Sequence, residues 1–205
     1  MITKKDIYDV IPKEVINSIF KKFDLDVFSG KHGFQHWARV IENGLFLSEH
    51  NNANPKVIIA FGFFHDSQRE NDANDPDHGF RGALLMNLYK DKINLTEHEF
   101  EKVFSACSGH TDELYHDDLD IATCWDADRL DLMRFNIDPD PYYLNQSISK
   151  KTSTIELRSM LSKFDNQIEW ANDILLDIKK INDIDLFLNN SNTENTVNIK
   201  NNYKI

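Results

Sequence analysis

Residues 57–66 read Val-Ile-Ile-Ala-Phe-Gly-Phe-Phe-His-Asp, the most apolar run of the chain followed at once by an imidazole and a carboxylate. Such a run predicts an element that is buried on all sides. Burying His65 and Asp66 at its end is costly unless each side chain finds a partner, and one divalent cation would be a partner for both. The stretch therefore predicts a core helix that carries a metal site.

Helices are expected to dominate the rest of the chain as well. Gly and Pro number 7 and 5 among 205 residues, which leaves little of the turn chemistry that a many-stranded protein needs. Four of the expected helices start near Pro12, at Asn54-Pro55, at Asp77 and at Thr96. The others are expected over about His32 to Asn51, Asp126 to Phe135, Ser153 to Phe164 and Asn166 to Ile181. Pro55 suits a first helical turn, and Thr96 with Glu99 forms a capping box. The sequence predicts one all-α domain, followed by an Asn-rich flexible tail over residues 189–205.

Charge and composition limit the partners that we expect. The net charge of −11 creates a general acidic field that disfavours nucleic-acid polymers and anionic membranes, so an anionic substrate would need cations placed locally. No run approaches the roughly 20 apolar residues of a membrane span, and the N-terminus lacks the apolar stretch of a signal peptide. The two cysteines, Cys107 and Cys124, fit a reducing cytoplasm. The oligomeric state stays open.

Candidate co-ligands for the metal lie on both sides of the His65-Asp66 pair. They are His36, His78, His110, Asp126 and Asp128. Asp126 and Asp128 lie about 200° apart around a helix, so one helix cannot easily direct both at one ion, and spacing alone leaves the choice between them open. Imidazoles and carboxylates suit manganese, iron, cobalt, nickel or zinc. The sequence thus predicts a divalent transition-metal site.

At these residues the chain resembles the HD-domain superfamily of metal-dependent phosphohydrolases. The resemblance rests on His36 in His-Trp-Ala-Arg-Val, on His65-Asp66, and on Asp128 in Ala-Asp-Arg-Leu. The resemblance covers residues 30–135 and implies an HD-domain-like helical bundle, with these four residues as metal ligands and Asp128 favoured over Asp126. We expect one such domain over residues 1–188.

Two further histidines resemble the extended pattern of family members that hold two metals. These are His78 in His-Gly-Phe-Arg-Gly-Ala and His110 in Ser-Gly-His-Thr-Asp. Two ions about 3.5 to 4 Å apart could be bridged by Asp66 and share a hydroxide that attacks a phosphoester. We therefore expect one or two ions and hydrolysis of a small phosphorylated metabolite or nucleotide. The His-His-Glu and Gly-Tyr-Pro signatures of the cyclic dinucleotide branch are absent from the sequence.

Other charged residues near the ligands are candidates for catalysis and substrate binding. The arginines expected to contact phosphate are Arg39, Arg69, Arg81 and Arg129, and the residues expected in catalysis are Asp66, Asp126, Arg39 and Arg129. Asp126, His32 and Asp112 could orient ligands or protonate a leaving group. Arg39 and Arg129 could instead form surface ion pairs.

Two other functions fit the same ligand set. A diiron oxygenase would need redox-active iron and would consume oxygen, and a non-catalytic nucleotide sensor would use the ion only for structure. Fold alone does not separate these functions. A second dipeptide, His116-Asp117, lies in a polar stretch, so we expect it in a solvated loop.

Overall fold

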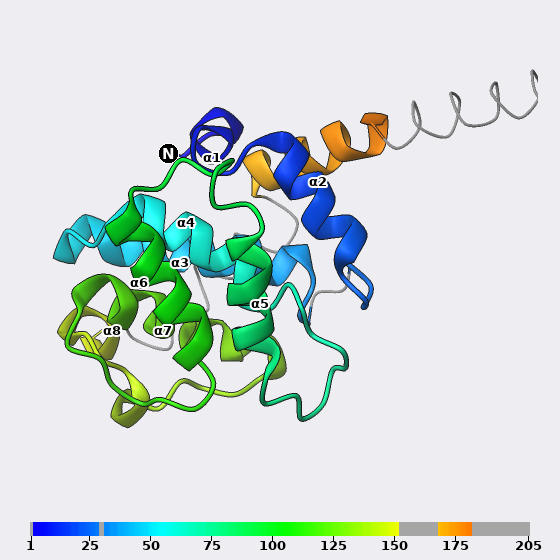
Figure 1. The fold of residues 1–205 in the computed structure, drawn as a ribbon. Coiled ribbons are helices and arrows are strands. Elements are labelled where there is room, and N and C mark those ends of the chain that lie inside the picture. Colours follow the sequence, from blue (N-terminus) through cyan, green and yellow to red (C-terminus); the bar gives the residue numbers. More distant parts are fainter. Residues whose placement is uncertain (1, 29–30, 152–167, 182–205) are drawn as a thin grey trace, which may run out of the picture.

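The computed structural model describes residues 2–28, 31–151 and 168–181 (Figure 1). Every regular element in these residues is a helix, which confirms the all-α prediction. The α-helices are α1 (Lys4–Val10), α2 (Lys13–Lys22), α3 (Phe34–Asn51), α4 (Pro55–Phe64), α5 (His78–Asn87), α6 (Glu97–Gly109), α7 (Leu119–Leu130) and α8 (Ser147–Lys151), and residues 169–181 are also helical. Two short 3-10 helices are η1 (Asp131–Phe135) and η2 (Pro141–Tyr143). The expected helix from Ser153 to Phe164 and the expected tail over 189–205 lie outside the described residues.

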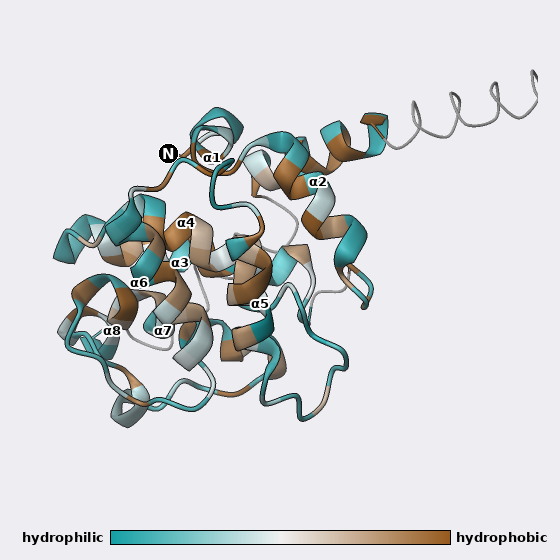
Figure 2. Cartoon of the chain, in the orientation of Figure 1, coloured by the Kyte–Doolittle hydropathy of each residue, from teal (hydrophilic) through white to brown (hydrophobic). Residues whose placement is uncertain are grey.

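Helix α4 lies at the centre of the bundle. All of residues 57–64 are buried, and α4 contacts α1, α3, α5, α6 and α7. Its first turn is capped by Asn54, whose side-chain oxygen accepts the backbone N–H of Lys56 at 2.9 Å. Figure 2 shows hydrophobic residues along α4, while the loop from α4 to α5 is hydrophilic. The apolar run thus places His65 and Asp66 at the end of the most enclosed helix.

Several helix ends match the expectations, and others differ. The capping box of α6 is present, because Thr96 accepts the N–H of Glu99 at 3.3 Å and Glu99 accepts the N–H of Thr96 at 2.7 Å. Helix α7 begins well before the expected start at Asp126, because Asp118 accepts the N–H groups of Asp120 and Ile121 and so caps an earlier first turn.

Two other helix starts differ from the expectations, and the start expected at Asp77 lacks its capping bond. The long helix expected from about His32 begins at Phe34, and Asp77 precedes α5 without a side-chain capping bond. Helix α1 was not expected, although Thr3 and Asp6 form a capping box at its start.

Two glycines let α5 approach its neighbours closely. A Cβ atom at Gly82 would lie 2.1 Å from the carbonyl oxygen of Phe64, and one at Gly79 would lie 2.2 Å from the carbonyl oxygen of Cys107. Neither approach leaves room for a side chain. Helix α5 can therefore lie against the C-terminal ends of both α4 and α6, which brings its first residue, His78, toward the end of the core helix.

No described helix combines the length and apolarity that crossing a bilayer requires.

Candidate metal centre

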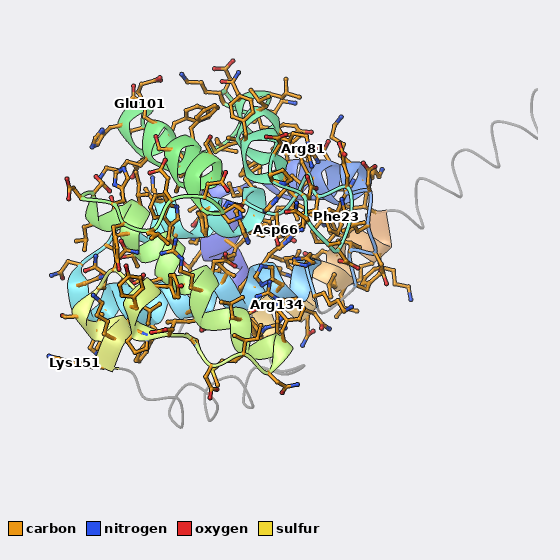
Figure 3. The ribbon with its side chains drawn as sticks, turned by 90° about the horizontal axis from the view of Figure 1, so that it is seen from below. Phe23, Asp66, Arg81, Glu101, Arg134 and Lys151 are labelled. Atoms are coloured by element: carbon orange, nitrogen blue, oxygen red, sulfur yellow. The ribbon has the colours of Figure 1, made fainter. Side chains whose placement is uncertain are left out.

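The six residues predicted as metal ligands converge around Asp66. They are His36 from α3, His65 and Asp66 directly after α4, His78 from the start of α5, His110 from the end of α6, and Asp128 from α7. Five of them are buried, and the side chain of Asp128 is 20% exposed. Figure 3 shows Asp66 near the middle of the molecule, with Arg81 and Arg134 on opposite sides of it in that view.

The first half-site consists of His36, His65 and atom Oδ2 of Asp66, with Asp128 beside the two imidazoles. The Nε2 atom of His36 lies 3.3 Å from this oxygen, 3.4 Å from Oδ1 of Asp128 and 3.1 Å from Nε2 of His65. The Nε2 atom of His65 lies 3.8 Å from each of the same two carboxylate oxygens. Four potential ligand atoms therefore surround one small volume.

The second half-site consists of His78 and His110, grouped around the other oxygen of Asp66, Oδ1. The Nε2 atoms of the two histidines lie 3.0 Å and 3.8 Å from this oxygen and 2.9 Å from each other. Ligand atoms that bind one ion at about 2.0–2.2 Å lie about 3.0–3.5 Å apart for right-angled to tetrahedral arrangements. The spacing in both half-sites is close to this range, and each half-site could hold a metal ion.

The hydrogen bonds of the four imidazoles decide which ring nitrogen faces the cluster. His65 donates through Nδ1 toward the carbonyl oxygens of Phe61 and Gly62, at 3.1 and 3.2 Å. His78 and His110 direct Nδ1 at the carbonyl oxygens of Asp75 and Cys107. A carbonyl oxygen only accepts, so the proton of each neutral ring sits on Nδ1.

The fourth imidazole, His36, follows the same rule, with the Asp131 carboxylate 2.7 Å from its Nδ1. All four Nε2 atoms therefore present lone pairs to the cluster, in two facing pairs. Lone pairs that face each other at 3.1 and 2.9 Å beside a carboxylate repel one another unless a cation lies between them. The donor set thus fits a metal ion in each half-site and offers borderline nitrogen and hard oxygen ligands.

The charge states of the first half-site suit cation binding. Burial lowers the pKa of His65 to about 3 despite the nearby carboxylates of Asp66 and Asp128, so this ring is neutral at physiological pH. Burial opposes ionisation of Asp66, yet its neighbours, among them the His32 ring 3.0 Å from Oδ2, hold the pKa of Asp66 well below its usual range. Asp128 likewise keeps a lowered pKa against its burial, chiefly through His65 and His36. Neutral imidazoles and ionised carboxylates are the forms that coordinate metals.

Two side chains outside the ligand set hold the ligands in place. His32, which was considered as an orienting residue, has its Nδ1 atom 3.0 Å from Oδ2 of Asp66. Asp131, which contacts His36, was not predicted from the sequence. A signal for it existed, because Asp131 follows Asp128 by three residues and so falls on the same helical face.

The four predicted arginines lie in different surroundings. Arg69 donates from Nε to Oδ1 of Asp66 at 3.1 Å and so contacts the cluster itself. Arg39 is buried and forms a bidentate salt bridge with Asp131.

The other two predicted arginines bond to groups outside the ligand set. Arg81 forms a salt bridge with Asp75 at 2.6 and 2.7 Å. Arg129 donates to the backbone carbonyls of Glu113 and Leu114 after α6 and of Tyr143 in η2. Contact of all four arginines with substrate phosphate stays a prediction.

The remaining candidates lie outside the group of ligand atoms. Both carboxylate oxygens of Asp126 accept backbone N–H groups, from Asn145 at 2.6 Å and Gln146 at 2.7 Å, so Asp126 fixes the chain that leads into α8. Asp112 is exposed in the turn after α6. His116 lies in a loop, as expected, and its Nδ1 accepts the N–H of Asp118. A catalytic role for Asp126 therefore has a structural alternative.

Comparisons with protein-family models, with curated proteins and with solved structures found no match to this chain. The chemistry of the cluster itself is therefore the basis for a functional proposal.

Proposed function

We propose that this protein is an HD-type, metal-dependent phosphohydrolase that acts on a small phosphorylated metabolite or nucleotide. The observation that carries the proposal is the Asp66 carboxylate, whose two oxygens each face a separate pair of imidazole Nε2 atoms. This geometry fits two neighbouring ions with a shared carboxylate, an arrangement typical of enzymes that hydrolyse phosphoesters. The His36, His65-Asp66 and Asp128 pattern of the HD superfamily supplies the first half-site, and His78 and His110 supply the second.

Bound ions would activate water as the nucleophile and offset negative charge on the phosphoryl oxygens. The protein's own residues hold the ligands and place positive charge nearby. Arg69 contacts Asp66 directly, and Arg134 donates to Asp131 at 3.4 Å. Their guanidinium groups would favour an anionic substrate within an otherwise acidic protein of net charge −11.

Phosphate release from a panel of phosphoesters and nucleotides tests the proposal. The full chain is stripped of metal and then reloaded with manganese, iron, nickel, cobalt or zinc. We expect turnover of at least one substrate with one of these metals, and about one to two ions bound per chain in the one- and two-metal schemes. His65→Ala and Asp66→Ala should abolish turnover while circular dichroism shows a retained helical fold.

The same preparations separate the alternatives. An oxygen electrode would detect the substrate-dependent oxygen consumption of a diiron oxygenase. Nucleotide binding without any turnover would favour a sensor. Full activity in metal-free protein would contradict the phosphohydrolase proposal.

A further inference from the structure

One carboxylate next to the cluster is surrounded by hydrogen-bond donors. Asp131 is fully buried at the junction of α7 and η1. Its Oδ2 atom faces Nδ1 of His36 at 2.7 Å, Nη2 of Arg39 at 3.1 Å and Nη1 of Arg134 at 3.4 Å, and its Oδ1 atom accepts from Nε of Arg39 at 2.7 Å. These four contacts fill the acceptor capacity of one carboxylate, so the orientation of Asp131 is fixed by partners on both of its oxygens.

The contacts join two helices in a paired arrangement. His36 and Arg39 lie three residues apart on α3, and Asp128 and Asp131 lie three residues apart at the end of α7, so each pair shares one helical face. Asp128 lies 3.4 Å from Nε2 of His36, while Asp131 binds Nδ1 on the opposite side of the same ring. The end of α7 therefore holds the His36 imidazole from both sides.

We infer that Asp131 is a positioning residue of the metal centre, which keeps the Nδ1 proton on His36 and directs the Nε2 lone pair of that ring into the first half-site. Arg39 holds Asp131 in this orientation through its two-pronged pair, so the role of Arg39 is to anchor the carboxylate. A carboxylate on the far nitrogen of a ligand histidine fixes the tautomer and makes the imidazole a stronger ligand.

The inference rests on the metal centre of the proposed function, but the state of the ring can be tested without metal. Long-range ¹H–¹⁵N spectra of the metal-free full chain distinguish a protonated Nδ1 from a protonated Nε2. The His36 signals are identified by their loss in His36→Ala. We expect His36 to carry its proton on Nδ1, far downfield and slow to exchange because a carboxylate accepts it.

Asp131→Asn is the decisive variant. An amide keeps the shape of the side chain but offers one neutral acceptor, so the Nδ1 proton of His36 should move upfield or exchange faster. Calorimetric titration with Mn²⁺ or Zn²⁺ should show about 10- to 100-fold weaker binding in the first half-site, the usual effect of removing such a support.

Asp120→Asn is the matched control. Asp120 is also a buried carboxylate on α7 with a cationic partner, because it accepts from Lys102 at 2.7 Å and from the N–H of Asn54 at 2.7 Å. It does not touch the ligands among the described contacts. This variant should lose stability without changing the His36 resonances or the metal affinity.

Arg39→Lys provides a second arm if Asp131→Asn does not fold. Lysine keeps the positive charge but cannot donate to both carboxylate oxygens of Asp131 at once, as the guanidinium does. Metal binding should therefore weaken several-fold, with Nδ1 of His36 still protonated. The inference is overturned if wild-type His36 carries its proton on Nε2. Metal affinity in both Asp131→Asn and Arg39→Lys within twofold of the wild-type value would overturn it as well. A wild-type chain that binds no metal would instead refute the proposed function, while the spectra would still decide the role of Asp131.

Discussion

The two half-sites share one carboxylate but are built differently. The first half-site takes its ligands from α3, α4 and α7 and adds a second carboxylate, Asp128, to the shared Asp66. The second half-site has two imidazoles and no carboxylate of its own among the described contacts. A divalent cation in the first half-site is therefore paired with more negative charge.

The groups that hydrogen-bond to the ligand histidines also favour tighter metal binding in the first half-site. In the first half-site, His36 is held by the ionised carboxylate of Asp131, whose pKa stays lowered despite burial because His36 and Arg39 stabilise its charge. In the second half-site, backbone carbonyls hold His78 and His110. A charge-assisted hydrogen bond is roughly twice as strong as a neutral one. We expect the first half-site to bind its ion tightly and the second to exchange its ion more readily.

Removing the shared carboxylate should have the largest effect. Asp66→Asn takes one ligand from each half-site, so both ions should be lost together and the half-sites should no longer differ. Changes to outer supports cost about 10- to 100-fold in metal affinity, and loss of a shared ligand should cost more than that. Metal analysis after dialysis against free ion measures how many ions stay bound per chain. Retention of one tightly bound ion would mean that Asp66 does not serve both half-sites.

Substitutions confined to one half-site should then separate the two ions. Asp128→Asn should remove the tightly bound ion of the first half-site. His110→Gln should remove only the weakly bound ion of the second half-site. Each variant should therefore keep about one ion per chain. Titration with Mn²⁺ followed by electron paramagnetic resonance counts the bound ions in each variant. Equal losses of both ions in the two variants would show that the half-sites bind as one unit.

A single methyl group on α5 should disturb the second half-site alone. In Gly79→Ala, the added Cβ would lie 2.2 Å from the carbonyl oxygen of Cys107 and 2.7 Å from the ring of His110, so α5 has to move away from α6. Overpacking of this kind costs about 1–3 kcal/mol in unfolding free energy, measured by denaturant titration. The weaker ion should bind less well, and the tight ion should be unaffected.

Gly44→Ala is the matched control for this effect. Its Cβ would lie 2.5 Å from the side chain of Ile58, in the packing between α3 and α4. It should destabilise the fold without selecting the second half-site. Equal loss of the weaker ion in both glycine variants would contradict the local effect.

Sequence reasoning located the ligand types and the core helix because both leave strong local signals. The apolar run over residues 57–64 can only be a buried element, and the His65-Asp66 pair at its end needs partners. The convergence of six side chains from separate helices depends on packing, and spacing along the chain cannot prove it. The resemblance to a known family supplied that step in the prediction.

The surroundings of the ligands were harder to predict. The partner of Arg39, the Asp131 carboxylate at the end of α7, was not predicted, and contact of Arg39 with phosphate stays a prediction. The carboxylate of Asp126 accepts backbone N–H groups of Asn145 and Gln146, and its predicted role in catalysis stays a prediction. Such pairings depend on how helices approach one another, so the sequence alone does not identify the partner of a charged residue.

The smallest expected effect is a difference in pH dependence between the half-sites. Burial alone would lower the pKa of His110, but its hydrogen bond to Asp66 and the charges of Asp128 and Asp66 raise it above 6.5. An imidazole must lose its proton to bind metal, so below that raised pKa the affinity of the second half-site should fall about tenfold per pH unit. His65, with a pKa of about 3, adds no such loss between pH 5 and 8 in the first half-site.

Metal titrations at pH 8, 7, 6 and 5.5 measure this difference in the wild-type chain, and the ion that remains in His110→Gln reports the pH dependence of the first half-site alone. In metal-free protein, low pH has the opposite effect, because protonation of His110 stabilises the fold. The raised pKa of His110 stabilises the fold fully below pH 6.5, and this contribution is lost as the pH rises through the folded-state pKa. Metal-free protein that becomes more stable across that rise would contradict the assignment of the proton to His110.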